Sequence, residues 1–137
     1  MKGDDFMLRD MELVRDLLTQ IANDEYKKVS FSLPLIGTRD GDVTEDEKIA
    51  YHLDIMKGAG LITFEKTEFK GGMRIHKMPQ LTWPGQDYYG AISNDTVWSK
   101  TKQTIQKSGM KVGEVSLDVI VALAKVKVKE MFGLPVE

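Results

Sequence analysis

The sequence has 137 residues, of which 42% are apolar and 29% are charged, enough apolar material for one folded domain with a buried core. It has no cysteine and only the histidines His52 and His76, which excludes disulfides and thiolate metal sites, so we expect no metal and no cofactor. The net charge is −2, so any contact with nucleic acid has to come from a local basic patch.

The N-terminal residues lack the apolar segment of a secretory signal peptide. The longest purely apolar run, residues 119–124, is far shorter than the roughly 20 residues that a membrane helix needs. We therefore expect a cytoplasmic protein without membrane contact. Residues 1–6 are expected to form a loose extension, and residues 7–137 a single domain.

The first predicted helix begins at Asp10, a good N-cap residue, and ends near Asn23 and Asp24. Its apolar residues recur at helical spacing: Met11, Val14, Leu17, Leu18 and Ile21. The next segment, 29–33, alternates apolar residues with serines and predicts a half-buried strand. Pro34 ends this strand or marks it as an edge strand.

The best-marked element is a helix that follows Thr44, which forms a capping box with Glu47. Its apolar stripe consists of Ile49, Leu53 and Met56. Gly60 is a suitable C-terminal cap, and the chain turns directly into a strand after it.

Two strands, 61–69 and 73–81, follow this helix and predict a hairpin. Gly71 and Gly72 between them permit the positive φ that a tight turn requires. The order of elements predicts an α+β, winged-helix-like fold, with a helix, a strand, a recognition-type helix and a β-hairpin wing.

Additional C-terminal helices are predicted after Thr82. Residues 84–107 form one bent helix or two, and a last helix starts near Ser116. One face of the last helix is broadly apolar. A second, narrower stripe on its far side consists of Val119, Leu123 and Val126. This stripe is either buried against a neighbouring helix or forms the interface of a symmetric homodimer.

Residues 51–62, YHLDIMKGAGLI, resemble the junction between recognition helix and wing in bacterial winged-helix regulators. Five segments in order, RDMELVRDLL, YHLDIMKGAGLI, LTWPGQDYYGAI, NDTVW and SLDVI, together resemble the uncharacterised bacterial and phage family called domain of unknown function 2513. The resemblance spans about Met7 to Leu134, with Met7 as the usual start. It implies a winged-helix-like fold and frequent carriage by prophages, and it implies no established activity.

The helix after Thr44 is poorly suited to read DNA. A helix-turn-helix has a positioning helix before the recognition helix, whereas here only a short turn-rich loop separates the helix from the preceding strand. With the apolar stripe inward, the outward arc carries Asp46, Glu47, Ala50, Asp54 and Lys57, with Tyr51 at its edge. Phosphate repels such an acidic surface, which we interpret as a solvated face.

The hairpin is better suited to nucleic acid. Basic residues gather there, diluted by two glutamates: Lys66, Lys70, Arg74, His76 and Lys77, with Glu65 and Glu68. A basic wing can lie along a phosphate backbone, although lysines on a hairpin also discourage edge-to-edge pairing of strands. The candidate nucleic-acid contacts are Lys57, Lys66, Lys70, Arg74 and Lys77.

Other chemistry-bearing residues are predicted to be structural. His52 is expected to pack at the edge of the core and to bond a backbone carbonyl. Four aromatic residues can in principle stack on bases, but their helical spacing favours the core: Trp83, Tyr88, Tyr89 and Trp98. The sequence contains no catalytic motif, so we expect no enzyme.

These patterns lead to two functional hypotheses. The first is a winged-helix-like regulatory or DNA-associated protein of bacterial or prophage origin, dimeric through its last helix, that contacts DNA mainly through the wing. The alternative is a protein-interaction module that keeps the winged fold, does not bind DNA and has an unknown protein partner.

Overall fold

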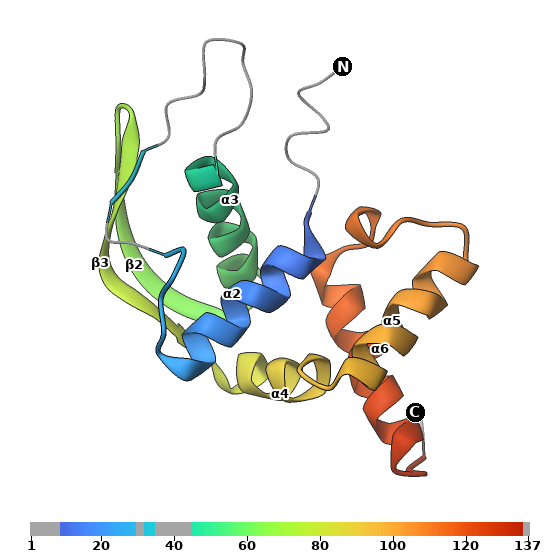
Figure 1. The fold of residues 1–137 in the computed structure, drawn as a ribbon. Helices are drawn as coiled ribbons and strands as arrows, with labels where there is room; N and C mark the ends of the chain where they lie inside the picture. Colours follow the sequence, from blue (N-terminus) through green and yellow to red (C-terminus); the bar gives the residue numbers. More distant parts are fainter. Residues whose placement is uncertain (1–8, 30–31, 35–44, 136–137) are drawn as a thin grey trace.

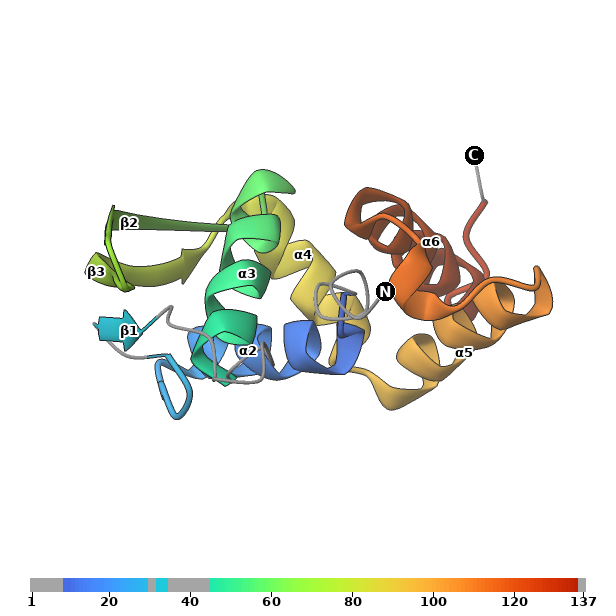
Figure 2. The same cartoon turned by 90° about the horizontal axis from the view of Figure 1, so that it is seen from above.

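The computed structural model describes residues 9–29, 32–34 and 45–135, which form a mixed α+β structure (Figure 1). Its elements in chain order are α2 (Met11–Asn23), β1 (Ser32–Pro34), α3 (Glu45–Gly58), β2 (Ile62–Phe69), β3 (Gly72–Leu81), α4 (Trp83–Ile92), α5 (Asp95–Lys107), the 3-10 helix η1 (Val112–Glu114) and α6 (Leu117–Met131). The sheet lies at one end of the molecule and α5 and α6 at the other, with α2, α3 and α4 between them (Figure 1, Figure 2). The expected N-terminal extension and Thr44 lie outside the described residues.

Helix α2 confirms the first predicted helix. The Asp10 side chain accepts hydrogen bonds from the backbone N–H groups of Glu12 and Leu13, both at 3.1 Å, and so satisfies donors that a helix start leaves free. Asp24 ends the helix in the left-handed conformation, with φ 55°. The apolar residues of α2 are buried along one face, as their spacing predicts.

Helix α3 buries its predicted stripe of Ile49, Leu53 and Met56. Ala50 is also buried, which corrects its expected place on the outward arc. The physical reason is that α3 packs against β1, β2 and α2 together, so that more than one stripe of the helix is covered. Gly60 caps the helix as predicted, with φ +79°.

The end of α3 is a Schellman-type cap. The N–H of Leu61 donates to the carbonyl of Met56 and that of Gly60 to the carbonyl of Lys57, each at 3.0 Å. The two bonds satisfy carbonyls that have no partner within the helix, and they turn the chain directly into β2.

The three strands form an antiparallel sheet in the order β1-β3-β2, and β1 is an edge strand that ends at Pro34. Lys70 and Gly71 form the hairpin turn, and Gly71 has the predicted positive φ, +88°. Gly72 differs from the prediction, because it is the first residue of β3 and pairs with Phe69. Two register shifts between Thr63 and Lys66 mark β-bulges, which increase the local twist of the hairpin.

Helix α4 begins against the chain segment that joins α3 to β2. The backbone N–H of Thr82 donates to the carbonyl of Leu61 at 3.0 Å, and the Thr82 hydroxyl donates to the carbonyl of Gly60 at 2.5 Å. The same hydroxyl accepts the N–H of Gly85 at 3.0 Å and thereby caps α4. A Cβ atom on Gly85 would lie 1.9 Å from the carbonyl oxygen of Leu61, so only glycine allows this approach.

Residues 84–107 form two helices, which settles the alternative left by the sequence. Asn94 caps α5 by accepting the N–H groups of Thr96 and Val97. The break is held to α2 by Arg15, whose guanidinium donates to the carbonyl of Ile92 at 2.9 Å and pairs with Asp95 at 2.5 Å.

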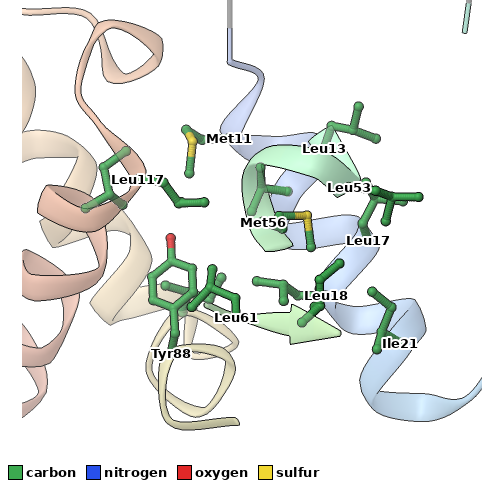
Figure 3. Packing of buried hydrophobic residues seen from close by; sticks show 14 of the residues in the cluster. Met11, Leu13, Leu17, Leu18, Ile21, Leu53, Met56, Leu61, Tyr88 and Leu117 are labelled. Atoms are coloured by element: carbon green, nitrogen blue, oxygen red, sulfur yellow. The ribbon is translucent and has the colours of Figure 1, made fainter. Parts of the chain in front are cut away.

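The core is one cluster to which α2, α3, β2, α4 and α6 all contribute (Figure 3). Tyr88 and Trp98 are buried as predicted, and the Trp98 indole donates to the carboxylate of Glu12 at 2.9 Å. Tyr89 is half-buried and packs against the cluster. Trp83 is 80% exposed, which corrects its expected place in the core. Trp83 lies in the first turn of α4, and the buried face of this helix is formed by Gly85, Tyr88, Ala91 and Ile92 instead.

His52 is fully buried and bonds a backbone carbonyl, as predicted. Its Nε2 accepts the N–H of Asp10 at 2.8 Å, so the proton of the neutral ring is on Nδ1, which donates to the carbonyl of Lys48 at 2.7 Å. Burial lowers the pKa of His52, and the bond to Lys48 opposes this effect only in part. The imidazole therefore links α3 to the start of α2 in its neutral form.

The buried histidine predicts a pH-dependent stability. Because the pKa of His52 is lower in the folded chain, the unfolded chain binds the proton more readily, and the free energy of unfolding falls as the pH drops below about 6.5. We expect the free energy of unfolding to decrease between pH 6.5 and 5.5, measured by urea denaturation. His52→Gln should remove this pH dependence of the free energy of unfolding. The matched change His76→Gln, at an exposed histidine, should retain it. Equal pH dependence in the two variants would contradict the assignment.

The approach of α4 to Leu61 predicts opposite effects at two glycines of one helix. Gly85→Ala should lower the free energy of unfolding by about 3 kcal/mol, because the new methyl group meets the Leu61 carbonyl. Gly90→Ala is the control, since a Cβ there meets nothing within 4 Å, and it should stabilise the protein by up to about 1 kcal/mol. Thermal and urea denaturation followed by circular dichroism measure both; similar effects at the two sites would contradict the prediction.

Candidate nucleic-acid interface

The hairpin has a buried face and an exposed face, set by the alternation of side chains along its strands. The buried face consists of Ile62, Phe64, Met73 and Ile75. The exposed face carries a shallow depression of about 300 Å³, lined by Thr67, Phe69, Arg74 and His76. The hairpin thus presents a continuous polar and aromatic surface on the side away from the core.

Three candidate cations are exposed on this hairpin: Lys70 in the turn, and Arg74 and Lys77 on β3. Within residues 9–29, 32–34 and 45–135, no carboxylate lies within ion-pair distance of any of the three. Arg74 is opposite the uncharged Thr67 in the register, whereas Lys77 is opposite Glu65. The positive charge is therefore strongest toward the turn.

Lys66 has a different role from the other candidates. Its ammonium pairs with Asp54 of α3 at 2.7 Å and with Glu68 at 2.8 Å, and its side chain is only 20% exposed. Burial lowers the pKa of Lys66, but the hydrogen bonds to the two carboxylates more than offset this effect and the pKa is raised. Lys66 thus ties the hairpin to α3 and is not available to a phosphate. Lys57 is exposed, with its Nζ 5.1 Å from the centroid of the Phe64 ring.

The ion pair with Lys66 accounts for the negative charge of Asp54, which helix capping does not explain. Asp54 lies beyond the first turn of α3, so the helix dipole gives no reason for its negative charge. The sequence contains a signal for this ion pair. Lys66 is an even number of residues from Ile62 and Phe64, so it lies on the same face of the strand as these residues, toward α3. The same parity places Phe69, 51% exposed, on the outer face.

The start of α3 is acidic, whereas its last turn carries the exposed Lys57. Its first turn carries Glu45, Asp46 and Glu47, a favourable arrangement at the positive end of the helix dipole. Such a surface repels phosphate, as the sequence predicts. The loop in which a positioning helix was expected to be missing, 35–44, lies outside the described residues.

The exposed depression brings together three kinds of contact. Thr67 and His76 are hydrogen-bonded through the hydroxyl and Nε2, which fixes the imidazole beside Arg74. An Arg guanidinium can bind a phosphate through two parallel hydrogen bonds, and an exposed aromatic ring can pack on a sugar or a base. The depression therefore combines a guanidinium, a hydrogen-bonded imidazole and an aromatic ring.

The predicted dimer residues lie at the other end of the molecule, on α6 (Figure 1, Figure 2). Val119 is 53% exposed. Leu123 is half-buried and packs against the core cluster, and Val126 is half-buried. The three residues therefore differ in how far they are available to a partner.

Residues 8–111 match the model of a protein family described as "Hypothetical protein (DUF2513)". The chain belongs to this family. The match confirms the predicted family, and four of the five segments lie within it. The fifth segment, SLDVI at residues 116–120, and the end of the expected span at Leu134 lie beyond it. An "Uncharacterized protein" of Haemophilus influenzae (strain ATCC 51907 / DSM 11121 / KW20 / Rd) is 30% identical over 129 residues, which are 93% of this chain and 100% of the relative. A search of solved structures finds no match to this DUF2513 protein.

The part of this DUF2513 protein that matches the family model contains the whole hairpin and the residues that hold the start of α4, namely Gly60, Leu61 and Thr82. It ends before α6. None of the helices that the structure describes has the length and apolar character needed to cross a membrane. Across the described ranges, no group of three or more histidine or acidic side chains is placed to hold a metal ion.

The pairing of Lys66 predicts a stability effect that other hairpin lysines lack. Lys66→Gln should lower the free energy of unfolding by about 1 kcal/mol, because two carboxylates then face each other without a cation. The loss should shrink in 0.5 M salt, which screens the charges. Lys70→Gln, in the exposed turn, should change the free energy of unfolding by less than about 0.5 kcal/mol, measured by urea denaturation. Equal effects at both lysines would argue against the ion-pair assignment.

Proposed function

We propose that this DUF2513 protein is a winged-helix-like, DNA-associated regulatory protein of bacterial or prophage origin, and that it contacts the DNA backbone mainly through the β2–β3 hairpin. The fold supports this proposal. A helix, an edge strand, a second helix and a hairpin follow one another, and the strand order β1-β3-β2 places the edge strand beside the returning arm of the hairpin. This order of elements supports the winged-helix-like arrangement that we propose.

The observation that carries the proposal is the separation of charge between the hairpin and α3. Lys70, Arg74 and Lys77 are exposed without an ion-pair partner among the described residues, whereas Lys66 is neutralised by Asp54 and Glu68. The hairpin therefore offers cations to phosphate, and α3 offers mainly carboxylates. We expect DNA to lie along the outer face and the turn of the hairpin and to avoid α3.

Such a contact is dominated by the backbone and is weakly sequence-specific. Each phosphate neutralised by a cation contributes a slope of about −0.9 to the dependence of log K on log salt, so three contacts give roughly −3. The exposed ring of Phe69 can add packing against sugar or base at the same face.

A second candidate function is a protein-interaction module that keeps the fold and does not bind DNA. The acidic first turn of α3, with Glu45, Asp46 and Glu47, favours this alternative, because it would suit a basic partner surface. The two functions use different faces, and their dependence on hairpin cations distinguishes them.

Fluorescence polarisation with labelled, mixed genomic DNA fragments tests the DNA proposal. Wild-type affinity should fall about 40-fold between 50 and 200 mM salt if three phosphates are contacted. Arg74→Glu should weaken binding by about tenfold or more at 50 mM salt. Lys100→Glu is the control for net charge, because Lys100 is an exposed lysine of α5 at the far end, and it should have little effect.

Two outcomes would contradict the proposal. Absence of binding by the wild-type protein at 50 mM salt would reject a DNA-associated role and leave the interaction module as the better account. Equal losses in Arg74→Glu and Lys100→Glu would show that net charge, and not the hairpin, governs binding.

A further inference from the structure

Helix α6 carries an apolar ridge on its solvent side. Val119, Ala122 and Val126 are spaced three and four residues apart, the spacing of positions that form the seam between two paired helices. Val119 and Ala122 are exposed and Val126 is half-buried. The opposite side of α6 is already occupied, because it packs against α4 and α5. The ridge is thus a separate surface from the one that builds the core.

Charges of opposite sign lie along one flank of this ridge. Asp118 is at its N-terminal end and Lys125 is two turns further on, and at helical geometry both lie on the same side of the seam. Both side chains are exposed, and neither has an ion-pair partner in the part of the chain that the structure describes. Lys127, in contrast, is paired with Glu130 within the helix.

We infer that the ridge of α6 binds a second copy of this chain, in an antiparallel pair of helices related by a two-fold axis near Ala122. In that arrangement Val119 of one copy lies beside Val126 of the other, and Asp118 of one lies beside Lys125 of the other. The small side chain of Ala122 allows the two backbones to approach at the axis. Antiparallel helices also place opposite dipole ends next to each other.

The self-complementary pattern is what favours a second copy over another partner. A two-fold axis pairs residue i with j and also j with i, so each oppositely charged pair forms twice only if one helix carries both charges at matched distances from the axis. Asp118 and Lys125 lie nearly symmetrically about Ala122 and meet this condition. Leu123, which packs against the core, lies beside the seam and not at its centre.

The surface is small, so the dimer should be weak. Helix α6 has 15 residues, about 22 Å in length, and a single helix pair of this size buries less area than a stable obligate dimer. We expect a dissociation constant of the dimer in the micromolar range. The inference does not depend on DNA binding, because the hairpin is at the opposite end of the molecule (Figure 2).

Sedimentation velocity of the full chain over a range of concentrations tests the inference. The wild-type protein should shift from monomer to dimer between about 1 and 300 μM. Ala122→Glu should remain monomeric over the whole range, because it places two carboxylates at the axis. Gln103→Glu, which makes the same charge change at an exposed position of α5, should behave as the wild type. A wild-type chain that is monomeric throughout, or a dimer that survives Ala122→Glu, would overturn the proposal.

Charge reversal tests the antiparallel register. Asp118→Lys and Lys125→Asp should each raise the dimer Kd by about tenfold, because like charges then meet twice. An equimolar mixture of the two variants should recover dimerisation, since each mixed dimer again contains two opposite pairs. Circular dichroism melting confirms that each variant is folded. Failure of the mixture to dimerise better than either variant alone would rule out this register.

Discussion

The close approach of the first turn of α4 to the backbone at Gly60 and Leu61 is the constraint on which the rest of the structure depends. At this point α3 has ended, β2 begins, and the carbonyls of both residues need partners. Thr82 supplies them with its backbone N–H and its hydroxyl. Because Gly85 has no side chain, α4 can lie directly against the Leu61 carbonyl. One junction therefore sets both the direction of the hairpin and the start of the C-terminal helices.

Helix α2 connects this junction to the two ends of the molecule. At its start, the backbone of Asp10 binds the buried imidazole of His52 on α3. Two residues later, Glu12 accepts a hydrogen bond from the indole of Trp98 on α5. Arg15 then holds the break between α4 and α5. Polar groups at the start of a single helix thus place the hairpin unit and the C-terminal helices relative to each other, while the apolar face of that helix fills the core.

The net charge of −2 conceals a segregated surface. The hairpin presents cations, the first turn of α3 presents carboxylates, and Lys66 joins the two elements through its ion pair with Asp54. The apolar ridge of α6 lies at the other end of the molecule (Figure 2). A two-fold pair built on that ridge would carry two hairpins, one on each copy, and two weak backbone contacts would then act together on one DNA molecule.

Local sequence patterns determined most elements of this protein and their order. The cap at Asp10, the apolar stripe of α3, the positive φ of Gly60 and Gly71 and the family itself follow from residues close to one another in the chain, because capping, periodicity and turn chemistry act over a few residues. Tertiary structure alone decided which polar groups meet. The sequence predicted that Lys66 binds phosphate, but its ion pair with Asp54 excludes this role. It predicted Trp83 in the core, but other residues of α4 face inward. Gly85 is required only because the Leu61 carbonyl lies beside it. Such contacts join residues far apart in sequence, and a linear pattern does not fix the distance between them.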